Sequence, residues 1–178
     1  MDIRAQLLKT HSRGNSDLVE AFAIENEEGL VSLMACFLSD EKVVAQRAAM
    51  VVGNLGRSEP RLLKPWWSEL VKVIDKPIHG ALRRNATRYF SELKIALPKS
   101  LDSRLVNHCT LLVEDPNQDV AIAAFAMQIV ADRAGSYPTH ALRLRNALES
   151  QLGEAKPGFR NRARKVLKQL EPILAELG

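Results

Sequence analysis

The sequence predicts an all-α protein, an α-α superhelix of about four helix pairs preceded by an N-terminal helical cap. An apolar pattern at positions i, i+4, i+7, i+8 and i+11, which marks one face of an α-helix, occurs four times along the chain. The steps between equivalent positions are 38, 38 and 39 residues, a period that suits one pair of helices. No segment alternates between apolar and polar residues for long enough to predict a β-strand.

The four copies of the pattern predict the second helix of each pair, at residues 44–55, 82–93, 120–131 and 159–170. Alanine stands at position i+4 of every copy, where a small side chain lets neighbouring helices approach closely. We therefore expect these alanines to be buried: Ala48, Ala86, Ala124 and Ala163. The third copy carries Gln128 and Ala131 where the other copies have larger apolar residues, so we expect looser packing there.

A shorter apolar segment precedes each copy and predicts the first helix of each pair, at residues 27–38, 62–74, 103–113 and 139–152. Turn-forming residues such as Asp115-Pro116-Asn117 separate the two helices of a pair. Two short helical segments with Gly14-Asn15 between them form the predicted cap. We expect one domain over residues 1–178, with the cap at 1–26 and repeats at about 27–59, 60–98, 99–136 and 137–178. A compact helical bundle without repeats is the alternative.

The segment DEKVVAQRAAMVVGNLG, residues 40–56, resembles the second helix of a HEAT repeat, with Asp40 in the turn and Arg47 in the helix. The whole of residues ~27–170 resembles a HEAT/armadillo-type repeat array. The last copy, KPGFRNRARKVLKQL, is similar to the C-terminal segment of small bacterial HEAT-like proteins without assigned chemistry. Some of those proteins are labelled adenylosuccinate lyase, but this chain lacks a Ser-rich catalytic loop and is short for that enzyme class.

Composition is that of an ordinary globular protein, with 46% apolar and 26% charged residues and a formal net charge of +4. Residues 1–60 hold six Lys/Arg and nine Asp/Glu, so the remainder carries the positive excess. Cys36 and Cys109 lie in apolar helical patterns, which predicts buried, reduced thiols. The N-terminal segment has no apolar stretch typical of a secretory signal, and no apolar run is long enough to span a bilayer. We expect a cytoplasmic protein.

Sequence patterns for known chemistry are missing. The chain contains no P-loop, no dinucleotide fingerprint, no HExxH, no GxSxG and no CxxC. Its four histidines lie in separate segments, and His108 and Cys109 point in different directions if the segment is helical. Asp115 and Asp119 suit a turn and a helix cap better than acid–base catalysis. We therefore predict no catalytic, cofactor-binding or metal site, and no small-molecule substrate.

Two features predict binding to a macromolecule. Trp66 and Trp67 are adjacent, so a helix would turn them about 100° apart and leave one as an exposed anchor unless neighbouring helices cover both. Basic residues gather on the predicted second helices, where a HEAT-type stack would expose them on its concave surface. The candidate binding residues are Arg47, Trp66, Trp67, Arg83, Arg84, Arg88, Arg160, Arg164, Lys165 and Lys168.

Three functions remain open at this point. The first is a non-catalytic scaffold that binds a protein partner on its concave face. The second is a nucleic-acid-binding protein that uses a basic concave surface or the C-terminal basic ridge. Aromatic residues make up only 5% of the chain, which weakens this alternative because base stacking requires them. The third is an enzyme with an unrecognised site.

Overall fold

A computed structural model describes residues 1–77 and 79–176, and every regular element within them is a helix. The prediction of an all-α fold is confirmed. The chain divides into two compact units, residues 1–93 and 94–178. The helices of unit 1 are α1 (Ile3–Lys9), α2 (Arg13–Glu25), α3 (Glu27–Phe37), α4 (Lys42–Ser58), a 3₁₀-helix (Pro60–Trp66), α5 (Trp67–Asp75) and α6 (Gly80–Glu92).

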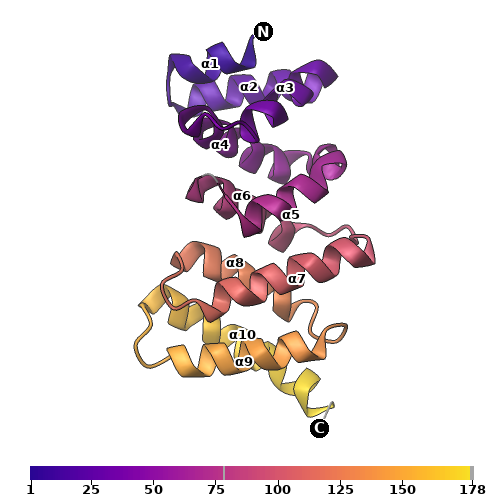
Figure 1. Cartoon of the computed structure of the whole chain (residues 1–178), viewed down its shortest axis with the longest axis vertical. Helices are drawn as coiled ribbons and strands as arrows, with labels where there is room; N and C mark the ends of the chain where they lie inside the picture. Colours follow the sequence, from indigo (N-terminus) through magenta and orange to yellow (C-terminus); the bar gives the residue numbers. More distant parts are fainter. Residues whose placement is uncertain (78, 177–178) are drawn as a thin grey trace. The chain divides into compact units, whose positions relative to one another are not determined.

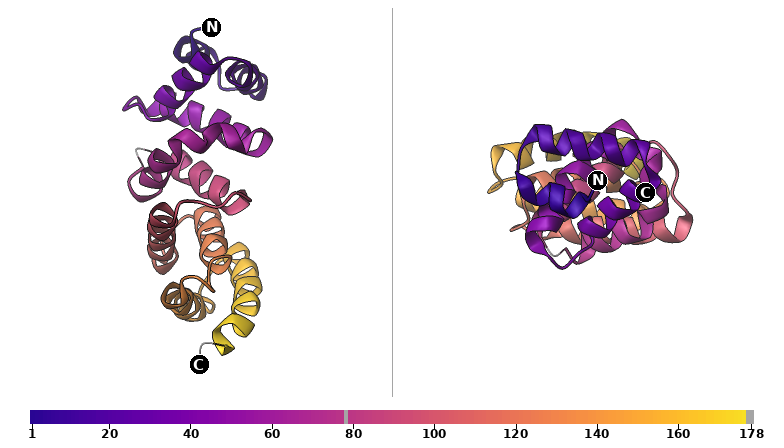
Figure 2. Two further views of the ribbon diagram at one scale, coloured as in Figure 1. Left: turned by 90° about the vertical axis from the view of Figure 1, so that its right-hand side faces the viewer. Right: turned by 90° about the horizontal axis from the view of Figure 1, so that it is seen from above.

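Unit 2 shows the pairing of helices most clearly. It contains α7 (Lys99–Glu114), α8 (Val120–Ala131), α9 (Pro138–Gln151) and α10 (Pro157–Ala175). The first helices α7 and α9 lie side by side in front, and the second helices α8 and α10 pack together behind them (Figure 1). The side view in Figure 2 separates these two layers. In unit 1, α2, α4 and α6 pack in succession as second helices.

The repeated apolar pattern lies mainly in the core, as predicted, although Leu93 of the second copy and Leu167 of the fourth are half-buried. Ala48, Ala86 and Ala163 are at most 1% exposed. Ala124 is half-buried, so its predicted burial is wrong, whereas Ala123 and Ala126 of the same helix are buried. The reason is that α8 packs against α7, α9 and α10 and therefore buries most of its circumference. A single stripe of five positions does not describe such a helix.

The N-terminal segment forms a further helix pair, whose break differs from the one predicted. The chain turns at residues 10–12, and Gly14 and Asn15 lie inside α2. Ser12 Oγ accepts the amide of Asn15 and caps the helix. The buried Asn15 side chain donates through Nδ2 to the carbonyls of Gln6 and Thr10 at 2.9 Å each, which ties α1 to α2. This pair packs on α3 and α4.

The single helix predicted over residues 62–74 is in fact two elements. Residues 60–66 form a 3₁₀-helix that contains Pro65, and the α-helix α5 begins at Trp67. Proline has no amide hydrogen and disfavours α-helical geometry at the residue before it, so a regular α-helix cannot run through Lys64 and Pro65.

Neither cysteine forms a disulfide, but the two thiols differ in exposure. Cys109 is fully buried, and burial raises the pKa of its thiol far above the ordinary value. Cys36 is only half-buried, so the prediction that both are buried is wrong for this residue. Burial still raises the pKa of the Cys36 thiol, which disfavours the reactive thiolate.

Candidate interaction surfaces

Two of the arginines predicted for binding hold helix ends within unit 1. The Arg47 guanidinium donates to the carbonyl of Leu7 at 2.8 Å, near the end of α1. Arg83 donates to the carbonyls of Ile74 and Asp75, both at 2.7 Å, at the end of α5. The last carbonyls of a helix have no partner within the helix, so each arginine satisfies backbone acceptors and favours the helix dipole.

The adjacent tryptophans lie in different environments. Trp67 is 4% exposed, and its indole Nε1–H donates to the hydroxyl of Tyr89 at 2.7 Å. That hydroxyl in turn donates to the carbonyl of Pro60 at 2.8 Å. Trp66 is half-buried and keeps part of its ring at the surface. Trp67 is therefore a core residue, and Trp66 is the tryptophan that a partner can reach.

The two remaining basic candidates of unit 1, Arg84 and Arg88, lie on α6. Arg84 is exposed, and Arg88 is half-buried. The Arg88 guanidinium pairs with Glu92 one turn later, at 2.8 Å between Nε and Oε1. This pair is about 40% exposed on each side, so it contributes little to stability and leaves a mixed rather than a purely basic surface.

Unit 1 contains a groove between α2 and α4 that was not predicted from the sequence. Its volume is about 650 Å³, and half-buried Met50 lies within it. Across it, Ser58 donates to the carboxylate of Glu20 at 2.7 Å. The groove thus offers an apolar thioether between side chains of both charges. Its lining residues are Arg13, Ser16, Asp17, Glu20, Met50, Asn54, Arg57 and Ser58.

The basic candidates of unit 2 lie on α10 and are not equivalent. Arg160 donates through Nε and Nη2 to the carbonyl of Ala155 at 3.2 and 3.0 Å, so it holds the turn before its own helix. Arg164, Lys165 and Lys168 are exposed. None of these three side chains forms an ion pair or hydrogen bond with another residue that the structure describes. The basic ridge therefore consists of these three residues.

Gln128, which interrupts the apolar pattern, belongs to a polar network between α8 and α10. Its amide donates to Asp132 at 2.7 Å and to Gln169 at 3.1 Å. Gln169 donates to the same Asp132 oxygen at 3.0 Å, and Arg162 donates to Gln128 at 3.1 Å. Gln128 therefore marks a polar face on the second helix α8. The sequence pattern had predicted only looser packing at this position.

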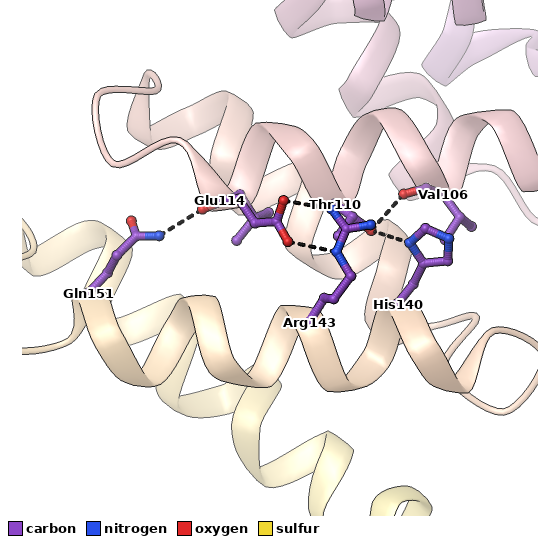
Figure 3. A network of polar contacts seen from close by, with 7 residues as sticks. Val106, Thr110, Glu114, His140, Arg143 and Gln151 are labelled. Carbon is purple, nitrogen blue, oxygen red and sulfur yellow. Dashed lines mark hydrogen bonds and ion pairs between the residues drawn. The ribbon is translucent and has the colours of Figure 1, made fainter.

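A second polar network joins the first helices α7 and α9 (Figure 3). Arg143 makes a two-bond contact with the Glu114 carboxylate, at 2.8 and 2.7 Å, which raises the pKa of the guanidinium. Thr110 Oγ1 lies 3.0 Å from His140 Nδ1 and donates its own proton to the carbonyl of Val106. Thr110 therefore accepts the Nδ1 proton of His140. Together these contacts fix the register of the two helices.

His140 makes the stability of this network depend on pH. Its pKa is lowered, first by burial and then by the neighbouring Arg143, whereas Glu114 acts in the opposite direction. The neutral imidazole is thus favoured by the folded state. This contribution to stability is complete above the pKa of an unfolded histidine, about 6.5, and is lost as the pH falls from there towards the lower pKa of the folded state.

We expect a His140→Gln variant to lose stability less steeply than the wild type between about pH 6.5 and 5. Thermal unfolding of both proteins is measured across this pH range. Subtracting one stability profile from the other removes the contribution of titrating carboxylates, which both proteins share. Parallel pH profiles would contradict the role given to His140. His11→Gln provides the matched control, because this histidine is exposed in the turn before α2 and lies outside the network.

No group of three or more His, Cys, Asp or Glu side chains that could hold a metal ion occurs among residues 1–77 and 79–176. Asp115 and Asp119 do act as a turn and a helix cap. Asp115 Oδ1 accepts the amide of Asn117, and Asp119 Oδ1 accepts the amides of Ala121 and Ile122. No helix in these ranges has the length and apolar character needed to cross a bilayer.

Comparison with known proteins identifies the fold family. A model of the HEAT repeat domain matches residues 3–170, which is nearly the whole chain and includes the α1–α2 pair. Searches of curated proteins and of solved structures found no match. The match agrees with the predicted helical repeat, whereas the narrower resemblance to small bacterial HEAT-like proteins stays a prediction.

Proposed function

Because the chain belongs to the HEAT repeat family, we propose that it is a non-catalytic scaffold that binds a protein partner on the faces of its second helices. The observation that carries this proposal is the α2–α4 groove. It combines a half-buried methionine, which adapts to apolar side chains, with donors and acceptors of both charges. Such a mixture suits a polypeptide better than a uniformly anionic ligand. The domain limits and repeat boundaries expected from the sequence form part of this proposal.

The remaining exposed candidates extend the proposed surface. In unit 1, Trp66, Arg84 and Arg88 supply an aromatic edge and positive charge. In unit 2, the α8–α10 network presents amide groups that can bond to a peptide backbone, with Lys165 beside it. We also propose a cytoplasmic location, since both thiols are free of disulfides, which suits a reducing compartment.

A bulky side chain in the groove tests the proposal. Asn54 lines the groove and is half-buried, so Asn54→Trp should fill part of the space and weaken partner binding by roughly tenfold or more. The measurement is capture of a protein from native lysate, with and without nuclease, followed by a titration with that purified protein. Lys72→Trp, on the exposed side of α5, is the matched control and should bind as the wild type does.

The alternative is a nucleic-acid-binding protein that uses the basic ridge of α10. The observation that favours it is the exposure of Arg164, Lys165 and Lys168. Three phosphate contacts would give a log–log slope of affinity against salt of roughly −2 to −3. Capture that disappears on nuclease treatment and shows this slope would support the alternative. Capture that survives nuclease but is insensitive to Asn54→Trp would reject the groove as the binding site.

A further inference from the structure

A second concave surface lies between α9 and α10, the last two helices described. Its volume is about 440 Å³. It is distinct from the α2–α4 groove and from the α8–α10 polar network. Its lining residues are Arg145 and Glu149 of α9, and Leu167, Leu170, Glu171, Leu174 and Ala175 of α10.

The floor of this groove is apolar. Leu167, Leu170 and Leu174 occur at i, i+3 and i+7, which places them along one side of α10. Leu170 is 1% exposed, whereas Leu167 and Leu174 are half-buried and can still lose exposed area to a partner. A narrow stripe of leucines with this spacing is the surface that an amphipathic helix covers when it lies in a groove.

Positive charge lies at one end of this stripe. Arg164 precedes Leu167 by three residues, Lys168 follows it directly, and both are exposed without an ionic partner among the described residues. Inside the groove, the Nε of Arg145 is buried and has no hydrogen-bond acceptor within the described chain. Its guanidinium nevertheless places positive charge along the groove, because Arg145 is one of the lining residues.

The acidic residues of the groove distinguish between two kinds of anionic partner. Glu149 and Glu171 lie beside the leucines, so a continuous polyphosphate along the groove would meet two carboxylates. It would also leave the apolar floor uncovered. A bound helix, in contrast, can confine its acidic side chains to the Arg164 end and place its apolar side chains over the leucines.

We propose that the α9–α10 groove binds an amphipathic helix of a protein partner. The apolar stripe of that helix covers Leu167 and Leu174. Its acidic residues, one turn apart, face Arg164 and Lys168. The one-turn spacing of Arg164 and Lys168 on α10 matches carboxylates at i and i+4 of the bound helix.

Two synthetic helical peptides of roughly 18 residues test this proposal. Both carry leucines at i, i+3 and i+7, and they differ only in a flanking pair of glutamates or lysines one turn apart. By fluorescence anisotropy at low salt, the glutamate peptide should bind at least about tenfold more tightly than the lysine peptide. The double variant Arg164→Glu/Lys168→Glu should abolish or reverse this preference. Because both positions are exposed, it should not disturb folding.

The matched control is Lys99→Glu/Arg104→Glu on α7, which reverses the same number of exposed charges in the same unit and should bind as the wild type does. Leu167→Ser should weaken both peptides, since it removes apolar contact without altering charge. Equal affinity for the two peptides, no binding of either, or an unchanged preference in the α10 variant would each overturn the proposal. So would a short DNA duplex that binds the wild type more tightly than the glutamate peptide does.

Discussion

Replacement of Trp67 by alanine should lower the free energy of unfolding by about 3–5 kcal/mol. The indole is 4% exposed, so its removal leaves a cavity between α5 and α6. It also removes the donor that contacts the Tyr89 hydroxyl at 2.7 Å. The ammonium of Lys64 lies 5.8 Å from the indole ring centroid and would lose this aromatic neighbour. Thermal unfolding should show a midpoint lower by roughly 10 °C or more.

Trp66→Ala is the matched control, because it removes the same side chain one residue earlier. Trp66 is half-buried, so we expect less than half the loss of stability caused by Trp67→Ala. Tyr89→Phe, which removes only the hydroxyl between Trp67 and Pro60, should cost about 1–3 kcal/mol because it leaves a buried indole donor unpaired. Equal losses for the two tryptophan variants would refute the assignment of Trp67 to the core.

Gly53→Ala should destabilise the protein by about 2–3 kcal/mol, although alanine is the better helix former. A β-carbon at Gly53 would lie 2.0 Å from Oδ1 and 2.8 Å from Cγ of Asn85. Asn85 cannot move away without cost, since its amide donates to the carbonyl of Ala81 at 2.9 Å. The substitution therefore either breaks this hydrogen bond or forces apart α4 and α6, which pack directly on one another. Chemical denaturation of wild type and variant measures the loss.

The control variant should change the free energy of unfolding in the opposite direction. Gly14 lies in α2, and a β-carbon there would meet no atom within 4 Å. Gly14→Ala should therefore stabilise the protein by up to about 1 kcal/mol through helix propensity alone. If both glycine variants were equally stable, the close approach of α4 and α6 at Gly53 could not be responsible.

The sequence predicted the helices of unit 2 well and those of unit 1 less well. The 3.6-residue periodicity is a local property, so the helices containing Ala124 and Ala163 were predictable. Local turn chemistry was harder to interpret. Gly14 was taken as a break, but Ser12 caps the helix that contains it, and the effect of Pro65 on the helix around it was overlooked. Both errors concern which of two competing local signals ends a helix.

Residue type predicted the candidate surface only in part, because the role of an arginine depends on what lies within its reach. Arg47, Arg83 and Arg160 have the same charge as Arg164, yet each donates to a backbone carbonyl. The acceptors for Arg47 and Arg83 are 40 and 9 residues away in the chain. The α2–α4 groove was missed for a similar reason, since its lining residues come from helices separated in sequence and share no motif.

The sequence alone determined the all-α class, the repeat period and the burial of three of the four repeat alanines, because burial of a helical face requires apolar residues at fixed spacing. Only the tertiary structure decided which basic and aromatic side chains face a partner. It separated Trp66 from Trp67 through the contact with Tyr89, and Arg160 from Arg164 through the carbonyl of Ala155. Periodicity gives the direction of a side chain around its own helix, whereas exposure depends on the neighbouring helices and turns packed against that side.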